Sequence, residues 1–174
     1  MIPVSLVLLV APFALLALEN KSLRQSIKFL GFDSQKPLLQ VGQGFLLFFF
    51  CLFLLAVEGI ILKAIGLLDT DKIVGFILQQ PWWALALATA VAPVAEETFF
   101  RGYLQKKIGV VLSSAAFAVL HYGYGSIAEI VAAFSVSMVL GYWVRKNKVI
   151  LPVIVAHAAY NAASIVVAMS TLKT

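Results

Sequence analysis

Six stretches of this chain are apolar over the length that lets an α-helix cross a lipid bilayer. A helix rises 1.5 Å per residue, so about 20 apolar residues cover the roughly 30 Å hydrocarbon core. Hydrophobic residues fill 62% of the 174 positions and charged residues 12%, whereas about a quarter of a soluble domain is charged. We therefore predict an all-α, polytopic membrane helix bundle that forms a single transmembrane domain over residues 1–174. The predicted spans are approximately 1–18, 38–62, 82–106, 109–124, 126–144 and 148–170.

Lysine and arginine are distributed unevenly between the connections. Ten of the 13 basic residues lie on one side of the predicted spans, mainly at 21–36, at 101–107 and at 145–148. Cytoplasmic connections carry such an excess, so we expect a multi-pass integral membrane protein with both termini outside. The alternation of Leu23 and Ile27 with basic residues predicts a short amphipathic helix on the cytoplasmic surface. The net charge of +5 then reflects membrane orientation, and the expected partners are membrane lipid and no nucleic acid.

The ionisable and amide side chains inside the spans lie at a common depth. Glu96 and Glu97 belong to the third span, His121 to the fourth, and His157 and Asn161 to the sixth. On ideal helices they lie roughly 13–19 Å from the cytoplasmic ends of their spans. Ionisable groups are costly in a membrane and usually mark a functional site. We predict a site near mid-membrane, in a cavity toward the cytoplasmic half.

Spacing separates the roles of the two glutamates. Glu97 and Arg101 are four residues apart and share a helix face, so they can form an ion pair. Glu96 lies about 140° around the helix from Arg101 and is left free to face the centre. The spacing predicts supporting roles for Glu97 and Arg101. His157 and Asn161 are also four apart, which places two polar groups on one face of the sixth span.

Two helix interruptions are predicted beside these residues. Pro93 cannot donate a hydrogen bond to the carbonyl of Thr89, and we expect a kink in the third span there. The residues after His121, from Tyr122 to Gly125, cannot continue a good helix. Irregular backbone at membrane depth is tolerated where protein or a water-filled cavity surrounds it. We therefore expect a hydrated cavity beside His121.

A carboxylate and a histidine around a cavity water, facing paired donors, have the groups needed to hydrolyse an amide. Glu96 would accept the proton of the water with His121 holding it, and His157 and Asn161 would bind the oxyanion. In a second scheme Glu96, His121 and His157 hold a divalent metal such as zinc with one open position. The residue types serve both schemes, so the expected cofactor is either none or a divalent metal.

Three motifs in the second half of the chain resemble those of the CAAX-processing and bacteriocin-processing (Abi, or CPBP) family of intramembrane proteases. The stretch from Glu96 to Arg101 matches Glu-Glu-x-x-x-Arg, the stretch ending at His121 matches Phe-x-x-x-His, and the last one matches His-x-x-x-Asn. The similarity covers about residues 82–170, which we take as the catalytic core. It implies a type II CAAX-type intramembrane endopeptidase with either a glutamate-and-water or a metal-dependent mechanism.

The roles that the resemblance implies agree with the assignments from depth. The first glutamate and the second-motif histidine, here Glu96 and His121, are credited with activating water, and the last motif, here His157 and Asn161, with binding the oxyanion. The implied substrate is a membrane-associated peptide or protein, of the prenylated CAAX type or the bacteriocin type. The first half of the chain is short beside the eukaryotic prenyl-protein endopeptidases, which leaves the prenylated substrate open.

Two further classes of protein compete with the protease hypothesis. A non-enzymatic membrane scaffold or bacteriocin-immunity protein would keep this fold without using Glu96 for chemistry. A proton-coupled transporter also uses Glu and His inside the membrane, but inverted repeats, typical of transporters, are not visible here. Glu58 and Glu129 are interpreted as interface or packing residues, with Glu129 a support for His121 if the intervening turn dips inward.

Overall fold

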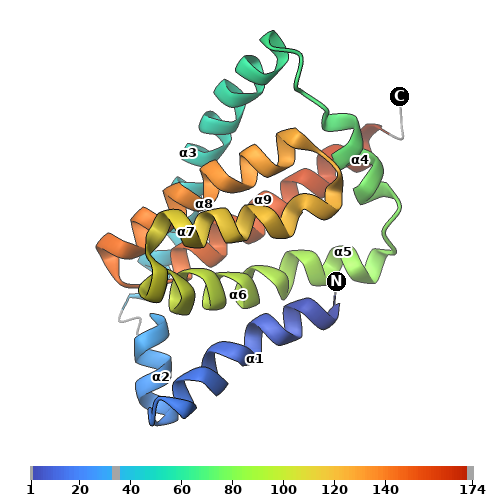
Figure 1. Ribbon diagram of the computed structural model, residues 1–174. Helices are drawn as coiled ribbons and strands as arrows, with labels where there is room; N and C mark the ends of the chain where they lie inside the picture. The colour runs from blue at the N-terminus through green and yellow to red at the C-terminus, as the bar shows by residue number, and fades with distance from the viewer. Residues whose placement is uncertain (1, 33–35, 172–174) are drawn as a thin grey trace.

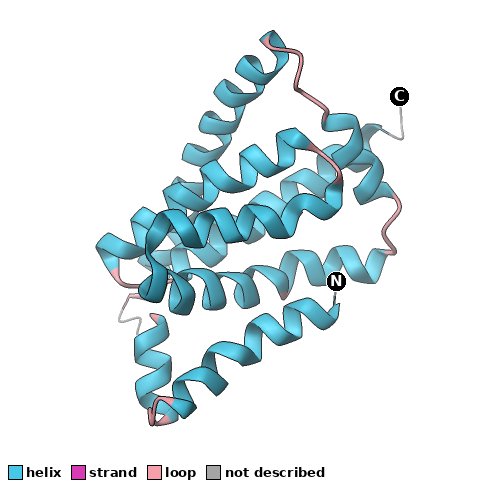
Figure 2. Cartoon of the chain, viewed as in Figure 1, coloured by secondary structure: helices cyan, strands magenta, loops and turns pink. Residues whose placement is uncertain are grey.

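The computed structural model describes residues 2–32 and 36–171 of the chain, and every regular element within them is a helix. Figure 1 shows their arrangement and Figure 2 shows the short loops between them. The all-α prediction is confirmed. The elements are α1 (Ile2–Leu18), α2 (Leu23–Leu30), α3 (Pro37–Ala64), α4 (Thr70–Leu78), α5 (Trp82–Ala90), α6 (Ala92–Glu97), the π-helix η1 (Thr98–Leu104), α7 (Gln105–Leu120), the 3₁₀-helix η2 (His121–Tyr124), α8 (Ile127–Asn147) and α9 (Leu151–Ser170).

Four helical stretches of the described residues are long and apolar enough to cross a membrane, where the sequence predicted six. They are Pro37–Ala64, Trp82–Tyr124, Ile127–Asn147 and Leu151–Ser170, and the first helix contributes a shorter apolar segment, Val4–Leu18. The predicted third and fourth spans form one continuous helical run because no loop separates them. Gly109 interrupts this run with φ 84° and ψ 170°, a conformation open to glycine. The chain reverses there (Figure 1), and α7 packs against η1, where the Ser113 hydroxyl donates to the carbonyl of Phe100 at 2.9 Å.

The connection between the second and third predicted spans contains a helix that the sequence analysis did not predict. This helix, α4, has nine residues and follows Asp69, a length below that of the predicted spans. Asp69 accepts hydrogen bonds from the Ser126 hydroxyl at 2.6 Å and from the backbone of Ile127 and Ala128 at 3.0 Å each. These bonds hold the pKa of Asp69 below its ordinary value, and the bond from Ser126 has the largest effect. The connection thereby caps the start of α8.

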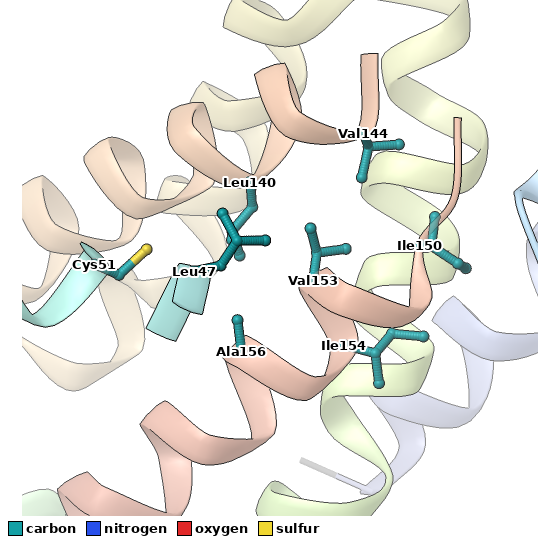
Figure 3. Close-up of a cluster of buried hydrophobic side chains, with 8 residues drawn as sticks. All are labelled: Leu47, Cys51, Leu140, Val144, Ile150, Val153, Ile154 and Ala156. Carbon is teal, nitrogen blue, oxygen red and sulfur yellow. The ribbon is translucent and has the colours of Figure 1, made fainter. Parts of the chain in front are cut away.

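The largest apolar cluster lies where α3, α8 and α9 meet (Figure 3). Leu47 and Cys51 of α3 contribute to it, together with Leu140 and Val144 of α8. The backbones of α3 and α9 approach closely because Gly44 lacks a side chain: a Cβ there would lie 2.6 Å from the Cβ of Val155. Small residues at helix interfaces allow such an approach in membranes. This packing fixes α9, which carries His157 and Asn161.

The amphipathic helix predicted from Leu23 and Ile27 is present as α2. Its first turn has a capping box between Ser22 and Gln25, and it ends at Gly31 in the left-handed conformation. Leu30, at its end, is fully buried and packs against η1 where a Cβ on Gly102 would come within 3.0 Å of the Leu30 carbonyl oxygen. This contact attaches the amphipathic helix to the segment that carries Arg101.

The close approach at Gly44 generates a test with a matched control. Gly44→Ala should lower the melting temperature of the purified protein, because overpacking a helix contact costs about 1–3 kcal/mol. Gly42→Ala should be neutral or stabilising, since nothing lies within 4 Å of the added Cβ and Ala exceeds Gly in a helix by about 0.5–1 kcal/mol. Equal melting temperatures for the two variants would contradict this account of the α3–α9 contact.

Candidate active site

The two glutamates lie on a short helix between two irregular segments. Val91 separates α5 from α6, as expected from Pro93, and α6 runs directly into the π-helix η1. The Thr98 hydroxyl donates to the carbonyl of Val94 at 2.6 Å and stabilises the junction. A π-helix has a wider turn than an α-helix and often occurs at functional sites. The π-helix was not predicted, because the spacing from Glu97 to Arg101 suits an ordinary α-helix equally well.

Glu97 and Arg101 form the buried ion pair predicted from their spacing. The Arg101 Nη1 lies 3.0 Å from Glu97 Oε1, with the side chains 1% and 0% exposed. The guanidinium also lies over the ring of Phe117, 4.3 Å from its centroid. The same Glu97 Oε1 is 2.8 Å from Nδ1 of His157, a contact that the sequence analysis did not foresee. Glu97 therefore joins the buried cation to a predicted site residue.

The bond to Glu97 sets the proton position on His157. A carboxylate paired with arginine accepts hydrogen bonds, so Nδ1 of His157 carries a proton and donates. Nε2, on the opposite side of the ring, lies 3.9 Å from Oε2 of Glu96. In the neutral ring Nε2 is then an acceptor, and it becomes a donor when the ring is doubly protonated.

His121 is held in a similar way by the backbone. It begins η2 and its Nδ1 lies 3.0 Å from the carbonyl oxygen of Phe117. A carbonyl can only accept, so Nδ1 donates and Nε2 is left as the acceptor of the neutral ring. Tyr124 stacks parallel to the ring with centroids 5.7 Å apart, and Phe117 contacts it at 4.6 Å. The α-helix α7 ends at Leu120, and η2 ends at Tyr124 before Gly125, which has the left-handed conformation.

Asn161 links α9 to α5. Its Nδ2 donates a hydrogen bond to the carbonyl of Ala88 at 2.8 Å. Ala88 lies two residues before the end of α5, close to the interruption at Val91. An amide nitrogen has two protons, so Asn161 keeps one further donor after this bond. The contact orients the side chain and leaves it able to bind a second acceptor.

The four residues predicted as catalytic line one cavity of about 80 Å³. A water molecule occupies about 30 Å³ in the liquid, so a few waters fit. Arg101 also contributes to the wall, as does Glu129 of α8, which is 8% exposed. Glu129 was interpreted as an interface or packing residue that would support His121 if the intervening turn dipped inward, and it lies in the cavity wall together with His121. It reaches the cavity because the 3₁₀ turn and Ser126 begin α8 beside His121.

The predicted metal ligands Glu96, His121 and His157 all line the cavity, but they are not arranged to hold one metal ion. Within the described part of the chain, no group of three or more His, Cys, Asp and Glu side chains is placed to hold a metal ion. His157 turns Nδ1 to Glu97 and its Nε2 lies 3.9 Å from Glu96. We therefore derive no step through a metal.

The helices and the cavity define a class: a multi-pass membrane protein with a buried cluster of Glu, His and Asn side chains. Residues 78–163 match the family model described as Type II CAAX prenyl endopeptidase Rce1-like. By this match, which includes every predicted site residue, this part of the chain belongs to the Rce1-like family, as the three motifs indicated. No curated protein and no solved structure matches the chain. The family indicates a CAAX-type intramembrane protease with a protein or peptide substrate.

Substitution of Glu97 removes both the counter-charge of Arg101 and the carboxylate that accepts from His157. Glu97→Gln leaves Arg101 buried without a counter-charge, and breaking a buried ion pair costs roughly 3–5 kcal/mol. The melting temperature of the purified protein should fall clearly. Glu58→Gln is the control, because Glu58 accepts a hydrogen bond from Ser135 and has no ion pair among the described residues. Removing both charges, with Glu97→Gln and Arg101→Gln together, should restore part of the stability. A Glu97→Gln protein as stable as the control would refute the pair's structural role.

Proposed function

We propose that this protein is an intramembrane endopeptidase that hydrolyses a peptide bond with Glu96 and His121 activating a water molecule. The observation that carries the proposal is the common cavity, whose wall contains a carboxylate, a histidine with a free acceptor nitrogen, and further polar groups from α9. A general base must reach the water that it deprotonates. In a cavity that holds a few waters, Glu96 and His121 both meet this condition.

In the proposed mechanism, Glu96 accepts a proton from the water as its oxygen attacks the scissile carbonyl. Nε2 of His121 accepts a hydrogen bond from the same water and orients it, since its Nδ1 is committed to Phe117. The position of Glu96 supports the role: it lines the cavity with its Oε2 3.9 Å from Nε2 of His157, whereas Glu97 is committed to Arg101. The two glutamates are therefore assigned different roles because their partners differ.

His157 and Asn161 would stabilise the oxyanion that forms on attack. Asn161 retains an N–H after its bond to Ala88. His157 donates from Nε2 in its doubly protonated form, which Glu97 holds in place through Nδ1. Donors oriented before the reaction typically lower the barrier by about 3–4 kcal/mol each. Nε2 of His157 donates only when both ring nitrogens carry a proton. Oxyanion binding would therefore depend on the contacts that join His157 to Glu97 and Glu97 to Arg101.

We propose that the substrate is a membrane-associated peptide or protein, of the prenylated CAAX type or the bacteriocin type, and that it enters from lipid. The family supports a protein or peptide substrate. In our proposal the bundle has six transmembrane segments, counting α1 and the two halves of the Trp82–Tyr124 run. Both termini lie outside, and the site is near mid-membrane, toward the cytoplasmic half.

The decisive test is Glu96→Gln in the purified full-length chain, assayed with membrane-associated peptides in lipid vesicles. Removing the general base should lower turnover by about 10²–10⁴-fold, while the melting temperature stays near that of the wild type because Arg101 keeps Glu97. Glu58→Gln, a carboxyl removed outside the cavity, should cleave normally. A Glu96→Gln protein that cleaves like the wild type would contradict the assignment of Glu96 as the general base. A biological function intact in that variant would instead favour the scaffold or immunity protein.

A further inference from the structure

A second carboxyl group, Glu129, faces the proposed catalytic cavity. Its side chain is 8% exposed, and it lines the cavity together with Glu96, His121 and His157. Among the described residues, no ion pair or hydrogen bond engages its carboxyl group. A buried carboxylate without a partner is costly, and such a group is more stable as the neutral acid. Glu129 therefore differs from Glu96 in the charges that surround it.

The start of α8 does not supply the missing positive partner. Glu129 lies in the first turn of α8, where the free N–H groups of a helix normally favour an anion. Here Asp69 accepts from the backbone N–H groups of Ile127 and Ala128, and the N–H of Glu129 donates to Ser126. The carboxylate of Asp69 thus already occupies the helix end. This arrangement leaves the Glu129 carboxyl without stabilisation as an anion from that source.

The cationic side chains of the cavity lie beside the other glutamates. Arg101 pairs with Glu97, and His157 lies between Glu97 and Glu96. The remaining ionisable groups in the wall are Cys51, His121, Tyr124 and Tyr160. Glu96 therefore has a basic side chain within 4 Å, whereas no ion pair reaches Glu129 among the described residues. Two carboxyl groups whose surroundings favour opposite protonation states are the arrangement that assigns a base and an acid.

Glu129 also lies at the boundary between two cavities. A second cavity of about 60 Å³ shares Glu129, Tyr160 and Asn161 with the catalytic one. The rest of its wall is mostly apolar, with residues of α4, α5 and α9. A peptide whose scissile bond lies between Glu96 and Asn161 can continue past Glu129 into this second cavity. The nitrogen that leaves when the bond breaks then passes the Glu129 carboxyl.

We propose that Glu129 is the general acid that protonates the leaving amine. This inference rests on the proposed protease function and assigns the second half of the reaction. The water oxygen forms a bond to the carbonyl carbon and its proton goes to Glu96. The carbon–nitrogen bond then breaks, and the nitrogen takes the proton of Glu129. The products are a carboxylic acid and an amine, and a cavity water returns the proton from Glu96 to Glu129, which closes the cycle.

The test compares two substrates of the same sequence, a peptide amide and an ester. The alcohol of the ester leaves readily as an anion and needs no proton from an acid. Glu129→Gln should lower kcat on the amide by about 10²–10⁴-fold with little change in KM, while the ester is cleaved at nearly the wild-type rate. The decline of amide cleavage as pH rises, due to loss of the acid form, should disappear. Glu96→Gln should slow both substrates, and Glu58→Gln neither.

Glu129→Asp keeps the test decisive if the glutamine variant does not fold. The shorter acid should reduce the ratio of amide to ester cleavage and retain part of the amide rate. An unchanged ratio in the folded variant, or an equal loss on amide and ester, would overturn the role of Glu129 as the acid. A wild-type protein that cleaves neither substrate, or a Glu96→Gln protein that cleaves both normally, would overturn the protease function itself.

Discussion

Neutralising the buried Arg101 guanidinium connects the structural core of the protein to its proposed chemistry. An arginine that is 1% exposed between helices needs a counter-charge, and Glu97 provides it. The same carboxylate accepts the proton of His157 Nδ1. His157 is thereby held with its other nitrogen toward Glu96. The ion pair thus stabilises the bundle and orients the α9 side of the cavity at the same time.

The irregular segments of the helices place this network. The interruption at Val91 and the π-helix η1 flank the two glutamates, and the 3₁₀-helix η2 begins with His121. Each irregular segment departs from ordinary α-helical hydrogen bonding, which is tolerated in a membrane where other polar groups or water are close. Asn161 contacts the backbone near the first segment and Asp69 holds the turn after the last. The cavity lies beside the segments in which the regular α-helical hydrogen bonds are interrupted.

The sequence predicted the helical class, the Glu97–Arg101 pair and the helix ends near Pro93 and His121, since each follows from composition or from local spacing. It did not predict the bond from His157 to Glu97, because that contact joins residues 60 positions apart and depends on how α6 and α9 are oriented. Glu129 was placed near His121 only as an alternative, because its position on the cavity wall depends on the turn that precedes α8. The family match covers the motifs, whereas the roles of these side chains stay predictions.

The proton positions on the two histidines test this account most directly. The chain has two histidines, so ¹⁵N NMR of the ring nitrogens in lipid can be assigned with one histidine variant. The account predicts a proton on Nδ1 of both rings at neutral pH, with His157 donating to Glu97 and its signal changing in Glu97→Gln. A His157 ring with Nδ1 unprotonated, or a signal insensitive to Glu97→Gln, would contradict the network from which the site is derived.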